Sequence, residues 1–383
     1  MNENIDLSLY VHLPWCVSKC PYCDFNSHTA GDAAPRERYL KAVEADLRAE
    51  VIRAGNRPLV SVFIGGGTPS FFTGKEIGQL IDVIAAEFSL QPDIEITMEA
   101  NPGTVEHGEL GDYATAGVNR LSLGAQSFNA ESLARLGRIH GPDEIYSAFD
   151  GASKAGFDSI NLDLMYALPG QDLAMAAYDV TEAVALAPAH ISYYQLTLEP
   201  NTVFHSNPPA DIPDEDESFA IQECGHELLG VEGYQQYEIS AFAKSGQQCR
   251  HNLNYWKFGD YVAVGAGAHG KVTASDGKVW RYEKPRHPLG FIEQAEKGAI
   301  DDREHQVSTT DIAFEFMLNA LRLPQGFMES EFTRSTGLSA ETVREGLESA
   351  RGRGMIESFE GPGWRPTALG LRFQNDLTGS FLP

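Results

Sequence analysis

The sequence has little positive charge and no long hydrophobic run. In 383 residues, 29 lysines and arginines stand against 54 aspartates and glutamates, for a formal net charge of −25. A chain this acidic is repelled by phosphate backbones, which disfavours nucleic acid as a partner but leaves room for a local basic pocket. No apolar run is long enough to cross a bilayer, so we do not expect an integral membrane protein. The start, MNENIDLSLY, has neither a basic nor an apolar leader region, which predicts a cytoplasmic protein.

Cysteine is also scarce, and its distribution argues against disulfides. Three of the five cysteines, Cys16, Cys20 and Cys23, fall within eight residues, while Cys224 and Cys249 stand alone. An odd number of cysteines in a long chain does not fit a secreted disulfide framework and favours a reducing compartment.

Short apolar strands alternate with amphipathic helices through the first half of the chain. The predicted strands are Leu7–Leu13, Leu59–Ile64, Ile94–Glu99, Arg120–Gly124, Ser159–Leu164 and His190–Leu196. Between the strands, apolar residues at helical spacing predict four amphipathic helices. Their apolar residues are Leu40, Val43, Leu47 and Val51 in the first, Ile77, Leu80, Ile84 and Phe88 in the second, and Ile145, Phe149 and Ala152 in the third, and the fourth helix is Asp172–Ala187. Six successive β/α units predict an α/β fold, a partial (β/α)6 barrel whose ligands bind at the C-terminal ends of the strands. The two further units of a complete (β/α)8 barrel are not evident after Glu199.

The pattern changes after about Val307. Ile312–Leu323 predicts an amphipathic helix, and Ser339 is placed to cap a second one. That second helix would carry Val343, Leu347 and Ile356, and it would be followed by an extended segment at Trp364–Thr367 and a helix at Ala368–Asp376. We therefore predict a core domain at residues 1–236, a connecting segment at 237–306, and a small winged-helix-like α+β domain at 307–383.

The three clustered cysteines follow the first predicted strand directly, which places them at the mouth of the barrel. A zinc site commonly has four ligands in two separated pairs, and this set has no partner pair. Three thiolates suit a [4Fe–4S] cluster that keeps one iron open for a small ligand. A structural zinc site completed by His12 or His28 is the alternative.

The spacing Cys16-x3-Cys20-x2-Cys23 resembles the signature of the radical S-adenosylmethionine (SAM) family. The resemblance implies that the cysteines hold the cluster and that its open iron binds the amino and carboxyl groups of SAM. Tyr22, just before the last cysteine, fits the family. The run GGGTP at residues 65–69 resembles the segment that holds the SAM amine, and its glycines let backbone approach a ligand closely.

Polar side chains stand at the ends of three further predicted strands. Glu99 ends ITMEANPG, Gln126 follows LSLGAQSF, and Asp163 lies in INLDLMYALPG. Acidic groups at strand ends often bind ribose hydroxyls, and Arg138 and His140 in RLGRIH would supply a cation near the same mouth. We expect these side chains to line one cavity.

The motifs YVHLPWCVSKCPYCDF, FIGGGTPS, MEANPG, LSLGAQSF, RLGRIH and NLDLMYALPGQ resemble one branch of that family. The branch contains the oxygen-independent coproporphyrinogen III oxidase (dehydrogenase) HemN and the heme chaperones HemW. The likeness is collinear from about Tyr10 to Glu199, and RPTALGLRF resembles the terminal module of the branch. It implies one SAM site lined by Tyr10, Gly66 and Glu99. It implies positions around a second SAM at Tyr22, Gly67, Thr68, Gln126, Arg138 and Asp163.

Two departures from the oxidase favour the chaperone group. Phe25 stands where the oxidase has a fourth cysteine, and a cluster that begins at Cys16 leaves no room for the N-terminal arm of that enzyme. The stretch HNxxYW, which starts at His251, resembles a signature of the chaperone group, and its imidazole is a credible ligand of heme iron. The alternative is a buried structural histidine.

The resemblance implies a protein that binds heme and a SAM-coordinated [4Fe–4S] cluster. It would pass heme to acceptor proteins, which we expect to be respiratory and membrane-associated. The alternative function is the oxidase reaction itself, the radical decarboxylation of propionate side chains. Phe25 and the missing N-terminal arm favour the chaperone over this reaction.

Overall fold

The computed structural model describes residues 5–31, 34–105, 107–300, 302–359 and 361–382. Within these residues the strands form one twelve-stranded sheet, one three-stranded sheet and one two-stranded sheet. Residues 1–4 lie outside the described residues. They belong to the N-terminal stretch in which we expect no leader region.

Six neighbouring strands of the large sheet are the six that the sequence predicts. They are β1 (Leu7–Leu13), β4 (Leu59–Gly66), β5 (Leu90–Ala100), β6 (Arg120–Gln126), β7 (Ser159–Tyr166) and β8 (His190–Gln195). They pair in this order and all run parallel, so their C-terminal ends share one edge. The predicted partial barrel is confirmed, and a functional site is expected at this edge.

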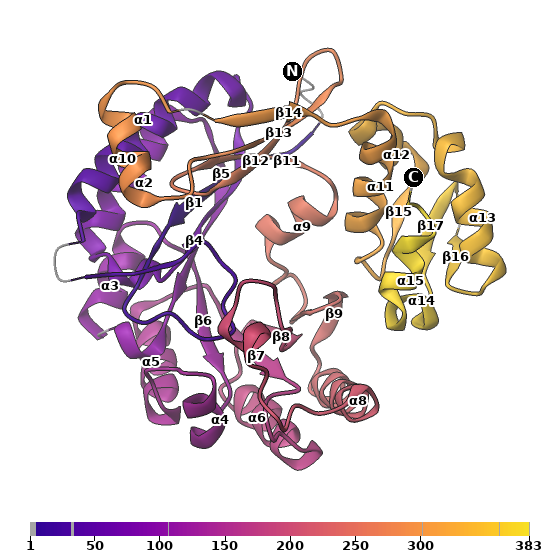
Figure 1. Ribbon diagram of the computed structural model, residues 1–383, viewed down its shortest axis with the longest axis horizontal. Helices are drawn as coiled ribbons and strands as arrows, with labels where there is room; N and C mark the ends of the chain where they lie inside the picture. Colours follow the sequence, from indigo (N-terminus) through magenta and orange to yellow (C-terminus); the bar gives the residue numbers. More distant parts are fainter. Residues whose placement is uncertain (1–4, 32–33, 106, 301, 360, 383) are drawn as a thin grey trace.

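Helices cover the outer face of the curved sheet (Figure 1). They are α1 (Arg36–Ala54), α2 (Gly74–Glu87), α3 (His107–Thr115), α4 (Ala130–Arg135), α5 (Pro142–Ala155), α6 (Leu173–Ala185) and α8 (Glu215–Val231), with the single turn α7 (Val203–Ser206) before α8. Their apolar stripes drive this packing, because Val43, Leu47, Ile77 and Ile84 are all at most 1 % exposed in the main core. A capping box between Thr73 and Glu76 fixes the start of α2.

The sheet extends beyond these six strands on both sides. Next to β1 lies β11 (Asp260–Val264), which runs parallel to it, followed by antiparallel β12 (His269–Thr273), β13 (Val279–Glu283) and β14 (Arg303–Gln306). Beyond β8 lie antiparallel β10 (Ala241–Ala243) and β9 (Gln235–Glu238). Helix α9 (Arg250–Trp256) lies on the inner side, toward the C-terminal unit (Figure 1), and α10 (Pro288–Glu296) packs on α1.

The C-terminal unit has its own core around Phe316, Phe332 and Leu347. Its helices are α11 (Thr309–Ala320), α12 (Glu329–Thr336), α13 (Arg344–Gly352), α14 (Ala368–Arg372) and α15 (Gln374–Gly379), and its sheet pairs β15 (Phe327–Met328), β17 (Gly363–Pro366) and β16 (Ile356–Phe359). This is the predicted arrangement of helices with a small hairpin. Ser339 caps a short 3-10 turn that leads into α13, as expected. The prediction that Ile356 belongs to that helix is wrong, because the helix ends before Gly354, whose φ of 73° reverses the chain into β16.

Candidate functional site

The three clustered cysteines lie in the loop that follows β1. Two short strands, β2 (Trp15–Cys16) and β3 (His28–Thr29), pair with each other and close the base of this loop. The ammonium group of Lys19 donates to the carbonyl oxygens of Phe25 and Ser27, at 3.2 Å each. The Lys19 side chain and the paired strands thus hold the loop in shape, and none of the three cysteines forms a disulfide.

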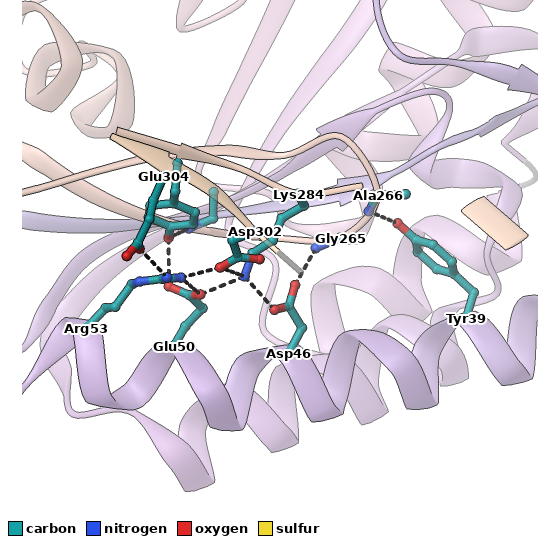
Figure 2. Close-up of polar contacts among 11 residues, drawn as sticks. Tyr39, Asp46, Glu50, Arg53, Gly265, Ala266, Lys284, Asp302 and Glu304 are labelled. Carbon is teal, nitrogen blue, oxygen red and sulfur yellow. Dashed lines mark hydrogen bonds and ion pairs between the residues drawn. The ribbon is translucent and has the colours of Figure 1, made fainter. Parts of the chain in front are cut away.

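The cysteine loop is also bound to the segments that follow β11 and β13. The Asn26 amide donates to the carbonyl oxygens of Ala266 and Arg286, at 2.9 Å each. Ala266 in turn donates its N–H to the Tyr39 hydroxyl on α1, and Gly265 donates to Asp46 on the same helix (Figure 2). Asn26 was not predicted as a site residue, because its partners are about 240 and 260 residues away in sequence.

A cavity of about 530 Å³ opens beside the cysteines at the predicted edge of the sheet. Its lining includes Cys16, Cys20, Cys23, Tyr22, Gly67, Thr68, Glu99, Gln126, Arg138 and Asp163. We call it the cluster cavity. The structure therefore brings the three cysteines together with all six residues that the resemblance assigns to a second SAM.

A second cavity of about 360 Å³ adjoins the first one. Its lining includes Tyr10, His12, Phe25, Gly66, Glu99, Tyr255, Tyr261, His269 and Arg286, and we call it the tyrosine cavity. Phe25 and Glu99 line both cavities. Tyr10 and Gly66 thus line a different cavity from the cysteines, as their assignment to a separate SAM site implies, whereas Glu99, Gln126, Arg138 and Asp163 share the cluster cavity, as we expected.

Arg138 is the principal cation of the cluster cavity. Its guanidinium group donates to the Gly124 carbonyl oxygen at 2.8 Å and approaches the Cys20 sulfur at 3.7 Å. Its Nε is buried without a partner among the described residues, so it can still bind a carboxylate. His140 does not line this cavity, so of the two residues that were predicted to supply a cation only Arg138 does so. Burial and the nearby Arg138 charge lower the pKa of His140 to about 4.

The polar strand ends face the cluster cavity from β5, β6 and β7. Asp163 accepts hydrogen bonds from Ser122 at 3.0 Å and from Asn161 at 2.8 Å, and burial raises its pKa. Gln126 holds a left-handed φ of 71°, an uncommon conformation for a residue other than glycine. Tyr194 on β8 donates to the Gln126 side chain at 2.7 Å and lines the cavity as well. The rule of polar residues at strand ends could have identified Tyr194, which we did not single out.

The glycine run lies between the two cavities and leaves no space for larger side chains. Gly66 has a φ of 115°, and a Cβ there would lie 2.6 Å from the His12 ring. A Cβ on Gly67 would lie 2.7 Å from the Trp15 carbonyl oxygen. The Gly66 N–H donates to Glu99 at 3.1 Å. Burial, and then repulsion by Asp163, raise the pKa of Glu99 to about 7.

The donor set fits an iron–sulfur cluster better than a single metal ion. Among the described residues, no three His, Cys, Asp or Glu side chains are grouped to hold one ion. His12, one of the two imidazoles considered for zinc, uses both ring nitrogens, at 3.0 Å from the Tyr10 hydroxyl and 2.9 Å from the Asn26 carbonyl oxygen. Three cysteine thiolates are the ligands that an iron–sulfur cluster takes, and all three thiols line the cluster cavity.

Helix α9 carries the HNxxYW stretch and presents different residues to the two cavities. Asn252 and Trp256 line the cluster cavity, and Tyr255 lines the tyrosine cavity. His251 lines neither of these cavities. Its ring is 3 % exposed, its Nδ1 lies 3.1 Å from the Ser61 hydroxyl, and burial lowers its pKa to about 3.

Comparison with known proteins agrees with this architecture. Residues 10–178 match the Radical SAM superfamily, and residues 307–373 match the HemN C-terminal domain. The chain is 49 % identical to the heme chaperone HemW of Escherichia coli K12, over 98 % of both chains. It is 33 % identical to the heme chaperone HemW of Bacillus subtilis, over 98 % of this chain and 99 % of the relative. The solved structure of coproporphyrinogen III oxidase (HemN) from Escherichia coli superimposes with a TM-score of 0.83 at 23 % identity, covering 99 % of this chain and 90 % of that one.

No helix in the described part of the chain is both long and apolar enough to span a membrane.

Proposed function

The chain belongs to the HemW family of heme chaperones, and from that premise we propose that it binds heme and delivers it to acceptor proteins. The observation that carries the proposal is the full-length identity to proteins of that name, up to 49 %. The exposed Phe25 in place of a fourth cysteine supports a carrier over an oxidase. Acceptors of the respiratory type at a membrane, and a cytoplasmic location for the carrier itself, belong to the same proposal.

The chain is a radical SAM protein by family, which implies a [4Fe–4S] cluster and SAM as its cofactors. Cys16, Cys20 and Cys23 would hold the cluster, and its open iron would chelate the amino and carboxyl groups of SAM. Burial raises the pKa of the Cys16 and Cys23 thiols, so iron binding must release their protons.

The second SAM that the resemblance implies would lie among the residues of the cluster cavity. Arg138 would bind its carboxylate through the guanidinium, and Asp163 would accept from the ribose hydroxyls. Gly67 and Thr68 would let the backbone approach the methionine part. We assign Tyr22 and Gln126 to the same SAM, because their side chains line the same cavity.

Tyr10, Gly66 and Glu99 would line the first SAM site of the prediction, at the tyrosine cavity. The division of the chain at residues 1–236, 237–306 and 307–383 stays a proposal too, as does a direct contact between heme and His251.

The test is a hemin titration of the full chain after its cluster has been reconstituted. We expect a shifted Soret band whose intensity saturates as hemin is added. A hemin absorption spectrum that is the same with the protein as in buffer alone would refute the chaperone function. An anaerobic assay with coproporphyrinogen III tests the alternative. We expect no protoporphyrinogen to form, and steady formation of that product would replace the chaperone by the oxidase.

A further inference from the structure

We propose that Asn26 is a positioning residue for the iron–sulfur cluster, and that helix α1 holds it in place from the outer face of the barrel. The inference rests on the proposed cofactors, a cluster on Cys16, Cys20 and Cys23 with SAM beside it. It assigns the placement of these cofactors to residues that carry no ligand atom. Asn26 lies three residues after Cys23, the last of the three cysteines.

Other segments anchor the first part and the middle of the cysteine loop. The Thr68 N–H donates to the Trp15 carbonyl oxygen at 2.8 Å, and the Phe204 N–H donates to the Pro21 carbonyl oxygen at 3.0 Å. Neither bond reaches the stretch in which the loop returns to β3. That stretch requires an anchor of its own, because a shift there would move Cys23 relative to the other two cysteines.

Asn26 anchors the stretch that follows Cys23. Its side-chain amide has two N–H groups, and both are used, one by the Ala266 carbonyl oxygen and the other by the Arg286 carbonyl oxygen, at 2.9 Å each. Its own carbonyl oxygen lies 2.9 Å from the Nε2 of His12 on β1. Three bonds from one residue thus fix the stretch against β1 and against the segments that follow β11 and β13.

The segments that receive Asn26 are shaped for this contact. Gly267 has a φ of 76°, and a Cβ there would overlap the Asn26 amide. Gly265 has a φ of 98°, and a Cβ there would overlap the His12 carbonyl oxygen. Glycine allows both the positive φ and the close approach. The Gly267 N–H also donates to the Pro285 carbonyl oxygen at 3.0 Å, so the two receiving segments are bonded to each other.

The Tyr39 hydroxyl connects α1 to the same region (Figure 2). It accepts from the Ala266 N–H at 2.8 Å and donates to the His12 carbonyl oxygen at 2.8 Å. Tyr39 is fully buried, and burial raises its pKa, so the hydroxyl keeps the proton that it donates. One oxygen atom on α1 thus bonds both the segment that holds Asn26 and the strand that leads into the cysteine loop.

An ion pair adds a second connection between α1 and these segments. Asp46 accepts from the Gly265 N–H at 3.0 Å and lies 2.7 Å from the ammonium group of Lys284, in the segment that carries Arg286 (Figure 2). Both side chains of the pair are at most 1 % exposed, so water screens the attraction little. A continuous series of hydrogen bonds therefore runs from α1 to the stretch that follows Cys23.

A displacement of this stretch would act on both cavities at once. The Cys23 sulfur lies 3.7 Å from the Ser27 hydroxyl, and Phe25 lines the two cavities. A shift therefore moves the third cysteine together with the wall, which changes how the open iron of the cluster would face SAM. Asn26 borders the tyrosine cavity, but backbone carbonyls use both N–H groups of its amide, so it acts on the cofactors through the loop.

The first measurement is the rate at which EDTA removes iron from the reconstituted cluster of the full chain. Asn26→Ala removes the anchor. Asn119→Ala is the matched control, because the Asn119 side chain also bonds two backbone groups of the sheet, at 2.7 and 2.8 Å, and lines neither cavity. We expect Asn26→Ala to lose iron about tenfold faster, since partners behind the ligands of a metal typically contribute about 10–100-fold to its affinity. Asn119→Ala should lose iron as the unchanged chain does.

Tyr39→Phe tests the hold from α1, because it removes a single oxygen atom that lines neither cavity. Tyr113→Phe is its control, since Tyr113 is also fully buried and its hydroxyl donates to a backbone carbonyl oxygen at 2.6 Å. The second measurement, made on all four variants, is the electron paramagnetic resonance spectrum of the reduced cluster with and without SAM. We expect Asn26→Ala and Tyr39→Phe to alter the change that SAM causes in this spectrum. Both controls should leave that change as it is in the unchanged chain.

The outcomes separate this inference from the proposed cofactors. If the unchanged chain takes up no cluster, or if SAM leaves the spectrum of its cluster unaltered, the proposed cofactors fail and the inference fails with them. If the unchanged chain holds a cluster that responds to SAM and Asn26→Ala matches Asn119→Ala in both measurements, the cofactors stand and the positioning role is refuted.

Two further results would overturn the inference. A Tyr39→Phe variant that matches Tyr113→Phe in both measurements would refute the hold from α1. Thermal unfolding of all four variants supplies the other check. Iron loss that follows the melting temperature equally in a variant and its control would mean that stability alone, and not the position of the loop, governs the cluster.

Discussion

Lys284 should be one of the most costly single residues to replace, because it is the cation at the centre of a buried acidic group. Its ammonium lies 2.7 Å from Asp46, 2.7 Å from Glu50 and 3.2 Å from Asp302, and its side chain is 1 % exposed (Figure 2). Burial by itself lowers the pKa of Lys284, but these carboxylates reverse the effect and raise it. Lys284→Met keeps the length of the side chain and removes the charge.

Loss of this charge leaves the acidic group uncompensated except by Arg53, which contacts Glu50 and Asp302 from the solvent side. Removing one partner of a buried ion pair typically costs about 3–5 kcal/mol, and we expect that range at neutral pH. Lys278→Met is the control, because Lys278 pairs with Asp276 at 2.9 Å with both side chains about half exposed. An exposed pair of this kind contributes about 0–1 kcal/mol.

The cost of Lys284→Met should depend on pH, and its sign follows from Asp46. Burial raises the pKa of Asp46 from 3.8 to about 6 in the folded chain, although Lys284 opposes this shift. The folded state thus holds more protons than the unfolded state between these values, and stability falls as pH rises through this window. Without Lys284 the pKa of Asp46 rises further, so the variant loses more stability at about pH 8 than at about pH 5.

The assay is thermal unfolding followed by circular dichroism at both pH values. A Lys284→Met variant that melts within experimental error of Lys278→Met would refute the reasoning. A destabilisation that is larger at low pH would also refute it, because the loss of stability would then not come from the ionised carboxylates.

Three further predictions concern the two cavities. Cys20→Ala should abolish cluster absorbance after reconstitution, whereas Cys224→Ala should leave it intact. The iron content per chain, measured for both variants, checks this prediction. Gly67→Ala should weaken SAM binding in calorimetry because its Cβ would meet the Trp15 backbone at 2.7 Å, while Gly111→Ala, with open space around it, should not. Affinity for the cationic SAM should rise as pH passes through about 7, where the Glu99 carboxylate forms, and Glu99→Gln should remove that rise. A pH dependence that persists in Glu99→Gln would contradict this assignment.

The sequence allowed the six parallel strands to be predicted because each is a short apolar run bounded by turn residues. It did not allow β11 to be placed beside β1. Asp260–Val264 is also a short buried run, but its partner Leu7–Val11 lies some 250 residues earlier, and periodicity holds no information about which strands pair. The extension of the sheet by β12, β13 and β14 was missed for the same reason.

The cysteines and the polar strand ends could be predicted because the C-terminal ends of parallel strands meet at one edge. The wall that Phe25 and Glu99 share between the two cavities could not be predicted, since it depends on where these side chains point. His269 and Arg286 were not predicted to line a cavity, because the strands β12 and β13 beside them were not predicted either. His140 was misjudged as a cation because burial, which lowers its pKa, is not visible in the sequence.

The wall that Phe25 and Glu99 form between the two cavities has a thermodynamic consequence. A ligand on either side fixes the same two side chains, so each ligand alters the free energy of binding the other one. Linkage requires this effect to be reciprocal: the factor by which a ligand in the cluster cavity changes the affinity for a ligand in the tyrosine cavity is the factor by which the second ligand changes the affinity for the first.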